Sequence, residues 1–221
     1  MNSYEVIIFD WDGTLMNSVP KIVSSVRDAV RTLGWQTLSD IEIREVIGLG
    51  LPEAFAQLFP QAGVAEREQL RAYYAEHFSQ QNQTPSPLFE GVEPVLAQLK
   101  KQNYQLAVAT GKSRRGLDRV WQEVDIAHYF MTSRCADESR SKPHPQMILE
   151  ILDELKLLPN QAVVVGDTEF DMEMAQRAGV DRIGVSYGAH AKERLLKYLP
   201  VACLDHISEL MPLLNNRSIP L

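Results

Sequence analysis

A short run of apolar residues near the N-terminus ends directly in two closely spaced acids. Residues 5–9 show no alternation of polar and apolar side chains, so we predict a strand that is buried on both faces of a parallel sheet. Asp10 and Asp12 follow at once, and Gly13 offers a sharp turn or a close approach to a ligand. In α/β proteins, ligands bind beyond the carboxyl ends of the strands. The sequence therefore predicts a functional site at the end of this strand.

Two carboxylates in such a place repel each other and resist burial unless a positive charge neutralises them. The commonest solution is a hard divalent cation with oxygen ligands, and we expect Mg²⁺. The alternative is that Asp10 and Asp12 only cap a helix, but one acid would be enough for that purpose.

A mainly helical block follows the first strand and its acidic turn. Apolar residues recur at helical spacing, and no strand pattern occurs before residue 88. The polar, proline-containing stretch 80–87 has the composition of a linker. We therefore predict an inserted helical subdomain over residues 16–87, with helices at 19–33, 39–46, 52–59 and 64–78.

The pattern changes after Gly91 to alternating helices and strands, which favours a parallel sheet. Strands are expected at 105–109, 129–132, 161–165, 182–185 and 201–204, with helices between them. The predicted fold class is α/β. Its core is a Rossmann-like parallel sheet flanked by helices, formed by residues 1–15 and 88–221.

Charge and cysteine content narrow the classes of partner. A formal net charge of −7 over 221 residues argues against a general nucleic-acid or membrane-surface binder, because such proteins rely on basic patches. Cys135 and Cys203 lie far apart without metal-type spacing, so reduced thiols are expected. With no signal-peptide or membrane-spanning pattern, a cytoplasmic protein is expected. The sequence indicates nothing about oligomeric state.

Several predicted strands end in residues suited to phosphate chemistry. Asp10 could accept a phosphoryl group as an acyl phosphate, and Asp12 could protonate the leaving oxygen and later activate water. Thr110, with the neighbouring Gly111 amide, could donate to a phosphoryl oxygen, although a lone threonine there is usually a capping group. Lys142 could offset the acids and stabilise the transferred group, although a lysine before proline is usually a solvated loop residue.

Two further acids complete the predicted metal site beside Asp10 and Asp12. Asp167 follows the buried strand at 161–165 and is the expected direct ligand. Asp171 lies one helical turn later and is expected either to bind the metal or to contact a ligand.

These residues fall into four motifs, at 10–15 (Asp-Trp-Asp-Gly-Thr-Leu), 110–112 (Thr-Gly-Lys), 142–143 (Lys-Pro) and 166–171 (Gly-Asp to Asp). In this order the chain resembles the haloacid dehalogenase-like hydrolase superfamily, in its phosphoglycolate phosphatase-like subgroup with a helical cap. The resemblance covers nearly the whole chain.

The resemblance implies a Mg²⁺-dependent phosphatase in which Asp10 is phosphorylated and Asp12 is the acid and base. It implies that Mg²⁺ is held by the Asp10 side chain, the Asp12 backbone carbonyl and Asp167. The helical insertion would be the cap that selects a small phosphorylated metabolite. Residues 47–51, including Gly48, resemble its substrate-facing loop.

Other activities of the same scaffold fit less well. Haloacid dehalogenation needs no metal and would not use Asp12, and phosphonate cleavage uses a cap lysine, yet no lysine occurs between Lys21 and Lys100. A non-catalytic binding module would not need all four motifs. A sugar-phosphate mutase or a pyrophosphatase would use the same motifs, so these alternatives stay open. Phosphoglycolate, a sugar phosphate, a nucleotide and pyrophosphate all remain candidate substrates.

Overall fold

The computed structural model describes residues 4–216, whose centre is a six-stranded sheet in the order β3-β2-β1-β4-β5-β6. Every neighbouring pair of strands is parallel. The sheet therefore has all its carboxyl ends at one edge. Its strands are β1 (Val6–Phe9), β2 (Gln105–Thr110), β3 (Thr132–Cys135), β4 (Ala162–Gly166), β5 (Asp181–Val185) and β6 (Ala202–Leu204).

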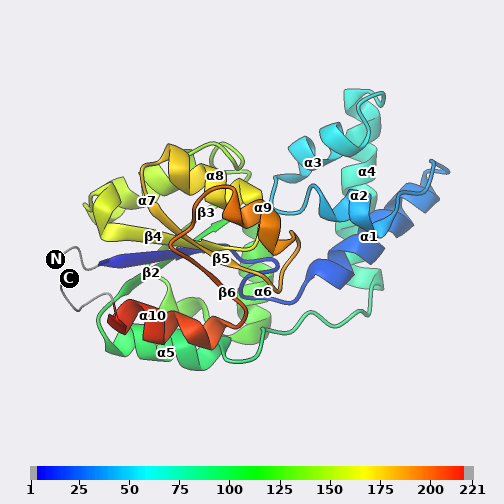
Figure 1. The fold of residues 1–221 in the computed structure, drawn as a ribbon. Coiled ribbons are helices and arrows are strands. Elements are labelled where there is room, and N and C mark those ends of the chain that lie inside the picture. The colour runs from blue at the N-terminus through cyan, green and yellow to red at the C-terminus, as the bar shows by residue number, and fades with distance from the viewer. Residues whose placement is uncertain (1–3, 217–221) are drawn as a thin grey trace.

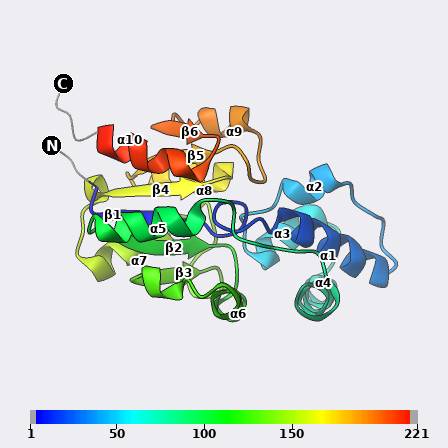
Figure 2. The same cartoon turned by 90° about the horizontal axis from the view of Figure 1, so that it is seen from below.

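Alternate side chains of β1 supply two different hydrophobic cores, because successive strand residues point to opposite faces. Ile7 and Phe9 pack with α5 (Val92–Lys101), α6 (Arg114–Val124) and α10 (Leu210–Asn216). Val6 and Ile8 pack on the other face with α7 (Gln146–Leu155) and α8 (Glu169–Arg177). Figures 1 and 2 show these two helical layers with the sheet between them. A short helix, α9 (Lys192–Leu196), packs near β5 and β6.

The region between β1 and α5 is helical and lies to one side of the sheet (Figure 1). It contains α1 (Val19–Thr32), α2 (Asp40–Arg44), α3 (Leu51–Leu58), α4 (Val64–Glu76) and a π-helical turn, η1 (His77–Gln81). We call residues 16–87 the helical insert. It has a separate apolar cluster, whose buried members include Val23, Val26, Val30, Phe55, Leu70 and Tyr74.

The chain leaves and re-enters the sheet layer at adjacent points. The Asn17 amide donates to the Pro87 carbonyl at 2.8 Å, and Met16 and Leu88 form an isolated antiparallel bridge. The core expected at 1–15 and 88–221 extends at both ends, by residues 1–3 and 217–221, beyond the described residues. Within residues 4–216, no helix is both long enough and apolar enough to cross a membrane.

The predicted fold class is confirmed, but the third strand was misplaced. We expected it at 129–132, whereas β3 begins at Thr132 and residues 127–129 form a 3₁₀ turn. The physical reason is that β3 is an edge strand, paired only with β2, so polar residues are tolerated on it. The side chain of Arg134, for example, extends from β3 and forms ion pairs with Glu150 and Glu154.

Candidate active site

The predicted site residues lie at the carboxyl ends of three adjacent strands. Asp10 follows β1, Thr110 is the last residue of β2, and Asp167 follows β4. Phe9 is in register with Val165, and the Asp10 amide donates to the Val165 carbonyl at 2.9 Å. The parallel sheet thus brings together residues that are far apart in the sequence.

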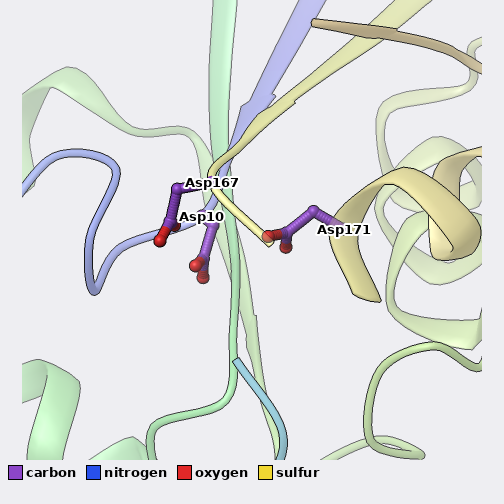
Figure 3. A group of neighbouring side chains, drawn as sticks. All are labelled: Asp10, Asp167 and Asp171. Carbon is purple, nitrogen blue, oxygen red and sulfur yellow. The ribbon is translucent and has the colours of Figure 1, made fainter. Parts of the chain in front are cut away.

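Asp10, Asp167 and Asp171 form a buried acidic cluster. One carboxylate oxygen from each residue lies within 4.8 Å of the other two. Figure 3 shows the three side chains gathered beyond the strand ends. Asp10 is 2% exposed and the other two are fully buried. Among residues 4–216, no other group of three or more acidic, histidine or cysteine side chains has a comparable arrangement.

Two glycines allow Asp167 to occupy its position. Gly13 has a φ of +85°, and a Cβ at this residue would lie 2.2 Å from Asp167 Oδ2. A Cβ at Gly188 would also lie 2.2 Å from the same oxygen. A larger residue at either position would therefore displace Asp167 from the cluster.

Lys142 lies among the acids. Its Nζ is 2.6 Å from Asp10 Oδ1 and 2.6 Å from Asp171 Oδ1, and the lysine side chain is fully buried. Burial alone would lower the pKa of Lys142, but the two carboxylates outweigh it and raise the pKa above its usual value. The side chain is therefore a fixed positive charge at the centre of the site.

Asp167 is held by two donors from other parts of the chain. The Thr14 hydroxyl donates to Oδ1 at 2.7 Å, and the Ala189 amide donates to Oδ2 at 2.7 Å. Burial and the nearby charge of Asp171 raise the pKa of Asp167 to about 7, although the two hydrogen bonds act against this increase. The position of the side chain is fixed while its charge is poorly compensated.

Asp10 has the least compensated carboxylate of the cluster. Burial raises the pKa of its carboxyl well above the usual value, Lys142 acts against this, and Asp171 and Asp167 add to it. Its Oδ2 is buried and has no hydrogen-bond partner among the described residues. Three carboxylates face one ammonium group, so negative charge is in excess. This set of oxygen donors fits a hard divalent cation.

The side chain of Asp12 points away from this cluster. Its Oδ1 accepts hydrogen bonds from the Ser18 hydroxyl at 2.6 Å and from Lys112 Nζ at 2.9 Å. We had expected Asp12 among the acids around the metal. With the carboxylate engaged elsewhere, only its backbone carbonyl is left for that role, which is the atom that the resemblance implies.

Asp171 uses both carboxylate oxygens within the protein. Oδ2 accepts hydrogen bonds from the Thr168 hydroxyl at 2.7 Å and from the Thr168 amide at 3.0 Å, while Oδ1 contacts Lys142. The bond from the Thr168 amide is part of a capping box at the start of α8. In this arrangement Asp171 holds Lys142 in position.

The second motif lies between the acids and the helical insert. Thr110 is buried, and its hydroxyl accepts a hydrogen bond from the Lys112 amide at 3.2 Å. Gly111 packs so closely on the insert that a Cβ there would lie 2.5 Å from the Leu49 carbonyl oxygen. The lack of a side chain at Gly111 thus permits this close approach.

The loop at residues 47–51 covers the strand ends. Gly48 has a φ of +105°, and a Cβ there would lie 2.8 Å from the Thr168 hydroxyl oxygen. The Gly50 amide donates to the Ser141 hydroxyl at 2.8 Å. The loop and the strand ends border a cavity of about 1080 Å³, lined among others by Asp10, Asp12, Gly48, Gly111 and Lys112.

Sequence reasoning missed several residues that position the site. Lys112 was considered only as part of a motif, yet it binds Asp12, and Thr14 binds Asp167. Ser18 precedes α1 as a capping residue would, but its hydroxyl donates to Asp12 instead. The only indication of these residues in the sequence was that they lie close to predicted strand ends or motifs. That position does not specify which side chain they contact.

Comparisons with known proteins identify the family and agree with the fold. Residues 7–185 match the family model described as haloacid dehalogenase-like hydrolase. The chain is 36% identical over 212 residues to the "Probable phosphatase IndB" of Dickeya dadantii, covering 93% of this chain and 91% of the relative. It is 28% identical to a phosphoglycolate phosphatase of Vibrio cholerae, covering 96% and 97%. A haloacid dehalogenase-like hydrolase from Bacteroides fragilis superposes with a TM-score of 0.87 at 26% identity, covering 94% and 99%.

Proposed function

Since this chain belongs to the haloacid dehalogenase-like hydrolases, we propose that it is a Mg²⁺-dependent phosphatase that hydrolyses a small phosphorylated metabolite through an aspartyl-phosphate. The observation that carries the proposal is the buried cluster of Asp10, Asp167 and Asp171 around Lys142, in which Asp10 Oδ2 has no hydrogen-bond partner. The names of the similar proteins support the same reaction class.

We infer that residues 1–15 and 88–221 form the catalytic core and that residues 16–87 form its cap. The separate apolar cluster of the helical insert supports this division, as does the bridge between Met16 and Leu88 where the chain enters and leaves the insert. The loop at 47–51 would be the part of the cap that meets the substrate.

The Asp10 and Asp167 carboxylates, with the Asp12 carbonyl, would hold Mg²⁺, and Asp171, whose oxygens contact Lys142 and Thr168, would lie behind these ligands. When bound, the ion would offset their negative charge and polarise a phosphoryl oxygen. Lys142, Thr110 and the Gly111 amide would bind the remaining phosphoryl oxygens, since ammonium, hydroxyl and amide groups are donors.

In the first step, one Asp10 carboxylate oxygen attacks phosphorus and forms an acyl phosphate as the bond to the alcohol oxygen breaks. Asp12, which must take up a proton before this step, gives that proton to the alcohol oxygen, so the alcohol leaves neutral. Ser18 and Lys112 hold the Asp12 carboxyl in place for this transfer.

In the second step, a water molecule attacks the phosphorus of the acyl phosphate. Asp12, now a carboxylate, takes the water proton, and the bond between phosphorus and Asp10 breaks. Inorganic phosphate leaves, and both carboxyl groups return to their starting states. The same residue thus serves as acid and then as base.

Phosphate release by the purified protein tests this function. We expect turnover with Mg²⁺ on at least one member of a panel containing phosphoglycolate, sugar phosphates, a nucleoside monophosphate and pyrophosphate. Chelation should abolish turnover, and added Mg²⁺ should restore it. Preferred cleavage of pyrophosphate, or return of the phosphoryl group to a sugar, would favour the two alternative activities. Full activity after exhaustive chelation would contradict the metal assignment.

A further inference from the structure

The cavity beside the acidic cluster is much larger than a phosphoryl group requires. It begins at Asp10 and Asp12 and extends into the helical insert, with a volume of about 1080 Å³. Pockets of roughly 300–1,000 Å³ hold ligands of drug size. Glycolate, the alcohol released from phosphoglycolate, would leave most of this space unfilled.

The two walls of the cavity differ in chemistry. The side from the helical insert is mainly apolar, with side chains that include Ile22, Val26, Ile43, Ile47, Phe55 and Phe78, and it also carries Glu76, Ser79 and Gln80. The side from α6 carries Arg115, Arg119 and Gln122, and the Arg119 guanidinium lies over the Phe78 ring at 5.4 Å. A flat ring with an apolar face and a polar edge would match both walls, whereas a small charged alcohol would leave the apolar wall exposed to water.

Tyr74 is an aromatic residue on the insert side of the cavity that offers a hydroxyl group. It is 9% exposed, and its ring is held by Phe55 and Phe78, with centroid distances of 5.9 Å and 5.7 Å. The residue lines the cavity, and its hydroxyl makes no hydrogen bond to another described residue. A phenol hydroxyl that lines a cavity without a protein partner is available to bind a ligand.

The chemical state of Tyr74 makes it a donor. Burial raises the pKa of its phenol well above the usual value, the negative charge of Asp12 adds to this effect, and Arg119 opposes it. The phenol therefore stays protonated.

We propose that the alcohol released by this enzyme carries an aromatic ring with a hydrogen-bond acceptor, that the ring packs on the apolar wall of the insert, and that the Tyr74 hydroxyl donates to the acceptor. The inference rests on the proposed phosphatase function and specifies its substrate class. Tyr74 is then a residue that determines specificity, because it contacts the leaving group and not the phosphoryl group.

A series of esters of primary alcohols tests the preference for a ring, since the acidity of the leaving group then varies little. We would compare kcat/KM for phosphoglycolate, 2-naphthylmethyl phosphate and quinolylmethyl phosphates with the ring nitrogen at different positions. The naphthyl ester should exceed phosphoglycolate by at least about 10-fold, because its ring removes apolar surface from water. A preference for phosphoglycolate would overturn the inference.

The variant Tyr74→Phe tests the hydrogen bond while keeping the aromatic packing with Phe55 and Phe78. It should lower kcat/KM for the best quinolyl ester by roughly 3- to 10-fold, the effect of removing one neutral hydrogen bond. It should leave the naphthyl ester unchanged, because that ring has no acceptor. Equal losses on both esters would overturn the role of Tyr74. The matched control is Tyr73→Phe, since Tyr73 packs on the insert's cluster without lining the cavity.

Hydrolysis tests the proposed phosphatase function, and binding tests the proposed substrate class separately. If no ester of any size is hydrolysed, the proposed function fails. Calorimetric titration of the same esters then tests the cavity alone. Tighter binding of the naphthyl ester than of phosphoglycolate would support the inference, and equal or absent binding would overturn it.

Discussion

The acidic site and the cavity of the helical insert differ in how their side chains are held. In the acidic site, ionic contacts as short as 2.6 Å fix Lys142 between Asp10 and Asp171. In the insert, apolar packing shapes the wall, and contacts with the core include one hydrogen bond from Gly50 and one ion pair from Glu45. We infer from this difference that ionic contacts position the groups that react, whereas apolar packing in the insert shapes the space that selects the substrate. Substitutions should therefore separate them.

The largest expected effect belongs to Asp10→Asn in the acidic site. The amide is nearly isosteric but cannot attack phosphorus, so turnover should fall by more than about 1,000-fold on every ester. The fold should persist, because the change removes one of three crowded buried charges. Phosphate release and thermal unfolding would be measured together. Wild-type-like phosphate release by a folded variant would contradict the role of Asp10.

Asp12→Asn should affect the second step of the reaction more than the first. Formation of the aspartyl-phosphate from an ester with a good leaving group should persist slowly, because such a group needs little protonation. Breakdown should stall, since water would lack its base. Acid-quenched samples should then contain labelled protein while phosphate release falls by roughly 100- to 10,000-fold. Rapid release of phosphate without accumulation of labelled protein would contradict this assignment.

The positions of the acidic residues could be predicted from the sequence because each follows a buried strand. Asp10 and Asp167 come directly after the apolar strands β1 and β4. Because these strands pair in parallel, the two acids lie side by side at the same edge of the sheet. The strand β3 could not be placed in the same way. Its sequence is polar, and only its position at the edge of the sheet explains why Ser133 and Arg134 are tolerated there.

The contacts that bring the insert to the core were beyond local reasoning. Gly50 of the insert meets Ser141 across 91 positions of the chain, and within the core Lys112 meets Asp12 across 100. No periodicity or motif specifies such partners. The contacts of the Tyr74 side chain were hidden for the same reason, since a helical pattern does not specify what a side chain meets.

Gly48→Val tests the contribution of the helical insert to substrate selection. Gly48 has a φ of +105°, and a Cβ would lie 2.8 Å from the Thr168 hydroxyl oxygen, so the loop at 47–51 must shift. We expect kcat/KM for the best ester to fall by about 10-fold or more, with a smaller loss on a small aryl phosphate. The Mg²⁺ concentration for half-maximal activity should stay the same. Equal losses on both esters would count against a selective cap, and no loss on either would remove the loop from the site.

The smallest expected effect concerns the ion pair that joins the insert to the core. Arg194 contacts Glu45 of the insert at 2.6 Å and Glu169 of α8 at 2.5 Å. Glu45→Gln removes the first contact and keeps the second. The Glu45 side chain is 47% exposed, so the contact is partly screened and its loss should raise KM only by about 2- to 3-fold at low salt. The core reaction should continue, leaving kcat nearly unchanged.

Salt dependence and a matched control decide whether this ion pair holds the insert over the site. At roughly 1 M salt, where the screening length is near 3 Å, wild type and Glu45→Gln should have the same KM. Glu68→Gln removes an equal charge from the insert, but Glu68 pairs with Arg71 inside the insert at 2.8 Å. That control should not change KM at any salt concentration. An equal rise in both variants would mean that the net charge of the insert attracts or repels the substrate, and the specific contact between Glu45 and Arg194 would then have no part in closing the cavity.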